Sequence, residues 1–174
     1  MLQRKITKAL LAWKDTPDHK PLIIKGCRQC GKTFSVLDFA NKHYRHVVYL
    51  NFFQNADYSS VFSGSLEVDH LIMMMSALLG PEAVFEPGNT VIILDEIQEC
   101  PEARTALKFF KLDGRFDIIA TGSLLGVRGY GKEPRSIPVG YETVIDMFPL
   151  DFEEFLWANG ISASATNLLR ECLR

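Results

Sequence analysis

A short aliphatic run that breaks at a glycine constrains this chain more than any other stretch. Residues 22–25 read Leu-Ile-Ile-Lys, and residues 26–33 then follow the pattern Gly-x-x-x-x-Gly-Lys-Thr. The two glycines let the backbone turn tightly and approach an anion without a Cβ in the way. Successive backbone N–H groups and the positive end of the next helix then form a cradle for phosphate. The spacing predicts a strand, a phosphate-binding loop and a helix over residues 32–42.

The residue types in this loop suit a nucleoside triphosphate that carries Mg²⁺. Lys32 is expected to reach the β- and γ-phosphates and to act in catalysis, and the Thr33 hydroxyl is expected to ligate the metal. A chance glycine-rich turn would give the same short pattern, so the interpretation needs partners downstream. The predicted nucleotide-binding residues are Gly26, Cys27, Arg28, Gln29, Cys30, Gly31, Lys32, Thr33 and Phe34.

Two of the four cysteines form a Cys-x-x-Cys pair, Cys27 and Cys30, inside the loop. The pair could suggest a zinc or redox site, but it lies wholly inside the phosphate loop and has no second paired motif, since Cys100 and Cys172 stand alone. The pair is therefore interpreted as small side chains that fill the loop, with oxidation as a hypothetical way to distort it. With no secretory signal in the sequence, the cysteines indicate reduced thiols and a cytoplasmic protein.

Two adjacent carboxylates follow the most apolar strand of the sequence. Residues 91–94 are aliphatic, and Asp95 and Glu96 come directly after them. Ligands of parallel α/β sheets bind at the carboxyl ends of the strands, where the phosphate loop also lies. Asp95 is expected to hold Mg²⁺ through water, and Glu96 to activate or orient the attacking water. A solvated strand end is the alternative, which the aliphatic run and the upstream loop disfavour.

Hydroxyl and basic side chains further along could complete such a site. Thr121 and Ser123 end the next strand and are expected to sense the γ-phosphate or hold the lytic water; a polar cap on the following turn is the alternative. Arg128, Lys132 and Arg135 are candidates for an arginine finger acting on a neighbouring subunit, against the simpler reading of a solvated basic loop.

Strands alternate with helices along the chain, which predicts an α/β protein with a parallel sheet. A helix is expected at its start, polar residues 55–64 are expected to form a loop, and Asp151 is expected to cap a late helix. The expected strands are 22–25, 46–52, 90–94, 116–120 and 143–148, and the expected helices are 3–14, 32–42, 66–79, 101–112, 151–158 and one from 163 onward.

Bulk properties fit one domain of 174 residues with 47% hydrophobic and 23% charged content. The net charge of −2 does not favour a nucleic-acid partner, although a local basic patch would remain compatible with one. Residues 71–79 are the most lipid-like stretch, far short of the roughly 20 residues that a membrane span needs. The absence of Asn-Lys-x-Asp after a late strand favours ATP over GTP.

Four motifs in this order resemble the predicted bacterial and archaeal AAA-type ATPases of the AAA+ superfamily. The motifs are Gly-Cys-Arg-Gln-Cys-Gly-Lys-Thr at 26–33, Leu-Asp-Glu-Ile-Gln at 94–98, Thr-Gly-Ser at 121–123 and Phe-Pro-Leu-Asp-Phe-Glu-Glu-Phe at 148–155. The resemblance implies a three-layer P-loop NTPase with a mainly parallel five-stranded sheet of order 5-1-4-3-2. The strand that carries Thr121 would lie between the loop strand and the Asp95 strand.

The resemblance also implies that the chain binds and hydrolyses Mg·ATP. Lys32, Thr33, Asp95 and Glu96 would take the roles given above, with Thr121 and Ser123 at the sensor position. The alternatives are a nucleotide-dependent switch with little turnover and a DNA-associated ATPase module.

Three departures from the family pattern qualify the resemblance. Cys27 and Cys30 replace other small or apolar loop residues, and Gly140-Tyr141 stands where relatives often have Gly-Arg before the last strand. Relatives usually continue into a further domain, so the chain looks like the ATPase core of a longer protein. It is expected to comprise an N-terminal helix (1–20), a core (21–150) and a truncated helical segment (151–174). A missing C-terminal domain or a homo-oligomer is then the expected partner, with weak turnover in its absence.

Overall fold

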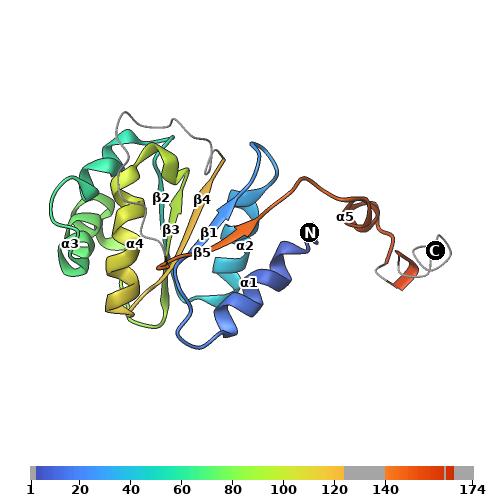
Figure 1. Ribbon diagram of the computed structural model, residues 1–174, viewed down its shortest axis with the longest axis horizontal. Coiled ribbons are helices and arrows are strands. Elements are labelled where there is room, and N and C mark those ends of the chain that lie inside the picture. Colours follow the sequence, from blue (N-terminus) through green and yellow to red (C-terminus); the bar gives the residue numbers. More distant parts are fainter. Residues whose placement is uncertain (1–2, 124–139, 163, 167–174) are drawn as a thin grey trace.

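The computed structural model describes residues 3–123, 140–162 and 164–166 of the chain. Its centre is a sheet of five strands in the order β2-β3-β4-β1-β5, which is the predicted order read from the other edge. Every neighbouring pair of strands is parallel. The strands are β1 (Leu22–Lys25), β2 (His46–Asn51), β3 (Thr90–Asp95), β4 (Asp117–Gly122) and β5 (Thr143–Asp146) (Figure 1).

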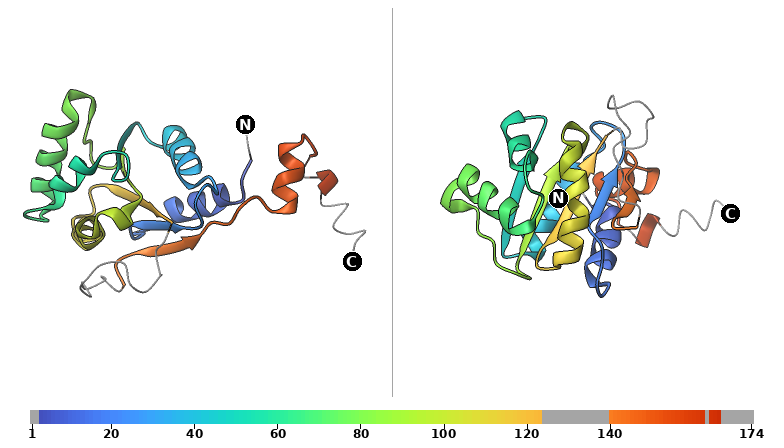
Figure 2. Two further views of the ribbon diagram at one scale, coloured as in Figure 1. Left: turned by 90° about the horizontal axis from the view of Figure 1, so that it is seen from above. Right: turned by 60° about the vertical axis from the view of Figure 1, so that its left-hand side comes forward.

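Helices cover both faces of this sheet, which completes the three layers that the sequence predicts. One face packs against α1 and α2, and the other packs against α3 and α4 (Figure 2). None of the described helices combines the length and the apolarity needed to cross a membrane. The helices are α1 (Ile6–Asp15), α2 (Lys32–His43), α3 (Val68–Leu79), α4 (Pro101–Asp113) and α5 (Phe152–Ala158).

The unbroken apolar runs of the inner strands follow from this double cover. Along β3, Ile92 belongs to the core under α3 and α4, and Ile93 belongs to the core under α1 and α2. Along β1, Ile23 and Ile24 divide in the same way. Successive side chains of a strand point to opposite faces, so a strand buried on both sides needs apolar residues at every position.

Two strands run further than the sequence predicts, and the difference matters for the site. The expected ends at residues 94 and 120 fall short, because β3 includes Asp95 and β4 includes Thr121 and Gly122. Pairing with neighbouring strands fixes these ends: Asn51 of β2 pairs with Asp95, and Ile24 of β1 pairs with Thr121. Both polar side chains therefore stand in the sheet itself and not in the turns that follow it.

Other predicted segments differ from the structure or lie outside the described residues. The expected loop at 55–64 was wrong, because Ala56–Phe62 is a 3-10 helix that buries its last two residues. The fifth strand is Thr143–Asp146, shorter than expected. The basic loop with Arg128, Lys132 and Arg135 lies outside the described residues, as does most of the helix expected from residue 163.

The segment after β5 leaves the sheet and carries α5 to the amino end of α1 (Figures 1 and 2). Asp151 caps α5 as predicted, since its side chain accepts from the Glu154 N–H at 2.9 Å. Glu154 returns the contact by accepting from the Asp151 N–H at 3.2 Å, which completes a capping box. The start of α5 is thereby fixed beside residues 4 and 5.

Candidate nucleotide site

The loop between β1 and α2 owes its shape to two glycines that act in different ways. Gly31 caps α2 with φ +92°, a left-handed conformation that favours glycine. A Cβ on Gly26 would lie 2.1 Å from the carbonyl oxygen of Met147, directly after β5. The sequence interpretation assigned both glycines to close approach of phosphate. In the structure, Gly26 makes room for a backbone carbonyl of this chain.

Lys32 is the buried cation of the loop. Its Nζ donates to the carbonyl oxygens of Gly26, at 3.1 Å, and Cys27, at 2.8 Å, and the residue is only 5% exposed. These contacts hold the ammonium group across the loop at the amino end of α2.

The rest of the predicted binding set differs in exposure. Cys27, Arg28 and Gln29 are exposed, as is Phe34 in the first turn of α2. Cys30 is buried, and its thiol donates to the Met147 carbonyl at 3.6 Å. Burial raises the pKa of the Cys30 thiol, so it remains a neutral thiol near neutral pH. No group of three or more metal-ligating side chains occurs within the described parts of the chain.

Asp95 is the centre of a buried polar cluster. The Thr33 hydroxyl donates to its two carboxylate oxygens at 3.1 and 2.9 Å, which joins two predicted metal ligands that are far apart in sequence. Asn51 Nδ2 donates to Asp95 Oδ2 at 2.8 Å and the Tyr49 hydroxyl donates at 2.7 Å. The Thr121 hydroxyl donates to Oδ1. Four side chains thus fix both oxygens of a carboxylate that is 1% exposed.

Sequence reasoning missed Tyr49 and Asn51. Burial and the neighbouring Asp95 raise the pKa of Tyr49 to about 12, so its phenol remains a donor at neutral pH. A signal was present, because the two residues are two apart in a strand and therefore share a face. Tyr49 and Asn51 could therefore have been predicted as site residues, because both are polar and lie at the carboxyl end of a strand, where the site was expected.

Glu96 lies in a second cluster, one residue beyond Asp95. It has φ +55° and ψ +49°, a left-handed conformation that is uncommon outside glycine. Its Oε2 accepts from Gln98 Nε2 at 2.5 Å and from the Ser123 hydroxyl at 3.2 Å. Gln98, which sequence reasoning quoted without a role, thus joins the site. Its Oε1 is buried and accepts no hydrogen bond from any described residue.

The two hydroxyl residues of β4 and its end are divided between these clusters. Thr121, wholly buried, contacts Asp95, and Ser123 contacts Glu96. The sequence analysis assigned both residues to one sensor position. In the structure they contact different carboxylates, because the left-handed backbone of Glu96 turns its side chain away from the direction of β3. Within the described chain, the structure therefore brings Thr33, Asp95 and Thr121 together in one group and Glu96 and Ser123 in a second, whereas Lys32 contacts only loop carbonyls.

The donor set of the first group fits a hard divalent cation. The Thr33 hydroxyl and the Asp95 carboxylate are oxygen ligands, which Mg²⁺ prefers. Mg²⁺ at nucleotide sites keeps several waters and takes further ligands from phosphates, so a hydroxyl and one carboxylate are sufficient protein ligands.

A parallel sheet of this order, with a glycine loop between β1 and α2, defines the class of P-loop nucleoside-triphosphatases. The AAA domain family matches residues 18–156, so the chain belongs to this family of P-loop ATPases. Among curated proteins, none matches the chain.

Two solved structures have a similar fold. A Walker-type ATPase of Pyrococcus abyssi is 16% identical, with a TM-score of 0.55 over 94% of this chain and 60% of that one. The ORC2 protein of Aeropyrum pernix, in ADPNP–ADP complexes, is 15% identical, with a TM-score of 0.60 over 93% of this chain and 52% of that one. The present chain thus spans between half and three fifths of their lengths.

Proposed function

We propose that this chain binds Mg·ATP at the loop of residues 26–33 and hydrolyses it. The observation that carries the proposal is the contact between Thr33, at the start of α2, and Asp95, at the end of β3. A hydroxyl and a carboxylate meet beside a buried lysine and the amino end of a helix. This arrangement supports a site that would hold metal, phosphate and nucleophilic water together.

Binding would begin with the loop and Lys32. The β- and γ-phosphate oxygens accept from the backbone N–H groups of the loop, and they replace the Gly26 and Cys27 carbonyls as partners of Lys32 Nζ. The ammonium group then balances phosphate charge where it had balanced only carbonyl dipoles. ATP is preferred to GTP because the sequence lacks a guanine-reading motif after a late strand.

The metal would be held by Thr33 directly and by Asp95 through water. When bound, Mg²⁺ neutralises charge on the β- and γ-phosphates. Thr33 would offer its hydroxyl oxygen to the cation, and Asp95 would keep its orientation because Tyr49, Asn51 and Thr121 also donate to it.

Hydrolysis would use Glu96 to orient and deprotonate the attacking water. Its carboxylate is the less buried of the adjacent pair, and it is aimed by Gln98 and Ser123. Ser123 also lies where a sensor of the γ-phosphate is expected, and Thr121 supports the metal side. General base catalysis of this kind contributes about 10²–10⁴ in rate.

A second candidate, a nucleotide-dependent switch with little turnover, is favoured by one observation. Glu96 Oε2 already accepts two hydrogen bonds, one of them from Gln98 at 2.5 Å. A carboxylate held in this way can accept a proton from water only at Oε1, or at Oε2 after one of these partners has left. Measured phosphate release at saturating Mg·ATP separates the two: multiple turnovers favour the hydrolase, and less than one turnover favours the switch.

The direct test of nucleotide binding is a thermal melt with and without Mg·ATP. At a hundredfold excess over Kd, binding adds roughly 2.7 kcal/mol, which corresponds to a rise in Tm of roughly 5–10 °C for a domain of this size. Lys32→Ala should melt without this rise, and Lys42→Ala, at the far end of α2, is the matched control that should keep it. No rise in the parent protein would refute the proposal.

A further inference from the structure

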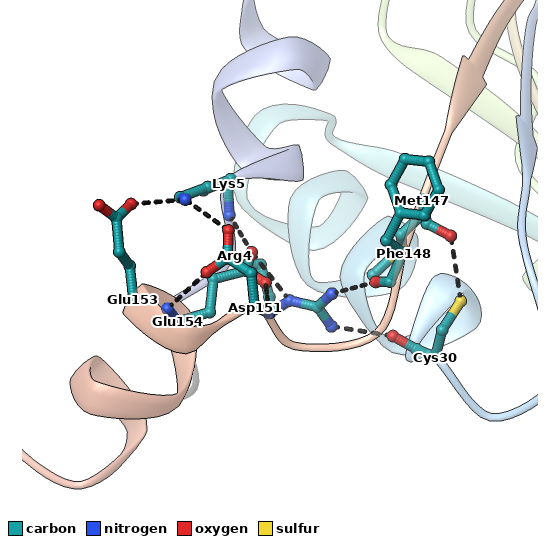
Figure 3. Close-up of polar contacts among 8 residues, drawn as sticks. All are labelled: Arg4, Lys5, Cys30, Met147, Phe148, Asp151, Glu153 and Glu154. Atoms are coloured by element: carbon teal, nitrogen blue, oxygen red, sulfur yellow. Dashed lines mark hydrogen bonds and ion pairs between the residues drawn. The ribbon is translucent and has the colours of Figure 1, made fainter.

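Arg4 is a buried cation outside the two carboxylate clusters. It precedes α1, and the residue is 7% exposed. One guanidinium nitrogen donates to the Cys30 carbonyl at 2.8 Å, and the other terminal nitrogen donates to the Phe148 carbonyl at 2.8 Å (Figure 3). Its Nε lies 3.2 Å from Glu154 Oε1, an ion pair without the alignment of a hydrogen bond. One side chain therefore joins the nucleotide loop, the segment after β5 and α5.

The contact with Cys30 has a consequence for phosphate binding. The carbonyl of Cys30 and the N–H of Gly31 belong to one planar trans peptide, so they point in opposite directions. By holding the carbonyl on its own side of the loop, Arg4 fixes the direction of the Gly31 N–H. That N–H lies directly before α2, among the backbone donors that form the phosphate cradle.

The packing at this point is close. An ideal Cβ on Gly31 would lie 3.1 Å from the Arg4 guanidinium nitrogen, so the guanidinium rests directly against the loop backbone. On the other side of the loop, the Met147 carbonyl accepts from the Cys30 thiol and fills the space beside Gly26. The loop is thus bracketed by residues from both ends of the described chain.

Glu154 supplies the counter-charge on α5. It is 4% exposed, and its Oε1 also accepts from the Lys5 N–H at 2.7 Å. A buried charge without its partner is strongly unfavourable, so Arg4 and Glu154 are held in place together. Within the described chain, Glu154 does not contact the loop itself, and its link to the loop runs through Arg4.

We infer that Arg4 is a positioning residue of the nucleotide site and that it couples occupancy of the loop to the docking of α5. Release of α5 removes Glu154 and the Phe148 carbonyl, and the guanidinium then leaves Cys30 for water. Phosphate in the loop favours the fixed peptide and hence docked α5. Because such coupling is reciprocal, anything that stabilises docked α5 tightens nucleotide binding by the same factor. The inference rests on the proposed function.

The first measurement is Mg·ATP affinity by titration calorimetry across a set of variants. Arg4→Met should weaken binding about tenfold, and Arg4→Lys should recover part of the loss because one ammonium lacks the fork that reaches two carbonyls. Glu154→Gln should weaken binding several-fold alone but add nothing to Arg4→Met. Lys8→Met is the matched control, because Lys8 is an exposed residue of α1, one turn beyond Arg4, so affinity should stay within about twofold.

The second measurement follows α5 itself. The chain has two tryptophans, Trp13 in α1 and Trp157 in α5. In a Trp13→Phe background, Trp157 emission should change when Mg·ATP binds. At saturating nucleotide the change should disappear with Arg4→Met and persist with Lys8→Met.

The third measurement needs no nucleotide. Hydrogen exchange of the loop peptide 26–33 should rise in Arg4→Met above the level in Lys8→Met, in protein that still melts cooperatively. Should Arg4→Met fail to fold, Arg4→Lys and Glu154→Gln carry the same comparison.

The outcomes separate the inference from the proposed function. Unchanged affinity, unchanged Trp157 response and unchanged loop exchange in Arg4→Met would overturn the inference and leave nucleotide binding standing. An additive effect of Glu154→Gln in the Arg4→Met background would also overturn it, because the coupling would then bypass Arg4. A parent protein that binds no Mg·ATP would refute the proposed function, and loop exchange alone would then decide the positioning role of Arg4.

Discussion

Asp95 and Glu96 are neighbours in sequence with the same chemistry, yet the protein surrounds them very differently. Asp95 is the last residue of β3, and four side chains from β2, β4 and α2 donate to it. Glu96 has turned out of the strand into a left-handed conformation, and two side chains donate to one of its oxygens. One carboxylate is fixed on every side, and the other is held at a single oxygen.

The difference matches what the two proposed roles require. A residue that positions a hydrated metal has to remain in place while the ligand changes, and a buried network of donors provides that rigidity. A residue that takes a proton from water needs a carboxylate oxygen that other donors do not occupy, and both described donors of Glu96 contact Oε2. The backbone turn between the two residues therefore converts one acidic pair into a fixed group and an adjustable one.

The largest expected effect concerns the adjustable carboxylate. Glu96→Gln keeps the size and the contacts with Gln98 and Ser123 but cannot accept a proton, so turnover should fall by about 10²–10⁴-fold. The Mg·ATP-induced rise in Tm should remain. Phosphate release and thermal melts measure the two effects, and Glu99→Gln, an exposed residue of the same turn, is the matched control. Full turnover in Glu96→Gln would remove this residue from the mechanism.

Substitution of Asp95, the fixed carboxylate, should lower the free energy of unfolding even in the absence of nucleotide. Asp95→Asn places an amide where donors converge, which leaves buried donors unpaired and should cost about 3 kcal/mol in the free energy of unfolding. Urea denaturation without nucleotide measures this change. Asp146→Asn, at the exposed end of β5, is the control and should change stability by less than about 1 kcal/mol. Equal losses in the two variants would refute the contrast.

The sequence predicts the position of the loop and the meeting of Thr33 with Asp95, because the carboxyl ends of parallel strands share one edge of the sheet. It does not predict that Asp95 and Thr121 lie inside their strands. Strand ends depend on pairing with neighbours, here Asn51 with Asp95 and Ile24 with Thr121, and local hydrophobicity does not encode that pairing. The strand order came from family resemblance and not from the residues alone.

The role of Arg4 could not be predicted from local sequence patterns. The two carbonyls that it contacts lie 26 and 144 positions away in the sequence. Backbone carbonyls are present at every residue, so no side-chain motif signals such contacts. Only the folded arrangement, in which the amino end of α1 meets both the loop and α5, identifies the residue.

The smallest expected effect concerns the support of Asp95. Tyr49→Phe removes one of its four donors and should lower the free energy of unfolding by about 1 kcal/mol, with a loss of Mg·ATP affinity of about threefold or less. Tyr44→Phe is the matched control, because the Tyr44 phenol also donates to a carboxylate, that of Asp117 at the amino end of β4, away from the carboxyl ends that carry the site. It should lower stability without changing nucleotide affinity.

The pH dependence of stability tests the same phenol in the unaltered site. Because burial and Asp95 raise the pKa of Tyr49 from 10.0 to about 12, the folded protein retains a proton that the unfolded chain loses. The contribution of Tyr49 is complete below pH 10 and is lost as the pH rises toward 12. Urea denaturation at intervals through this window should show a shallower decline in Tyr49→Phe than in the parent. Parallel curves would mean that the phenol titrates normally and does not support Asp95.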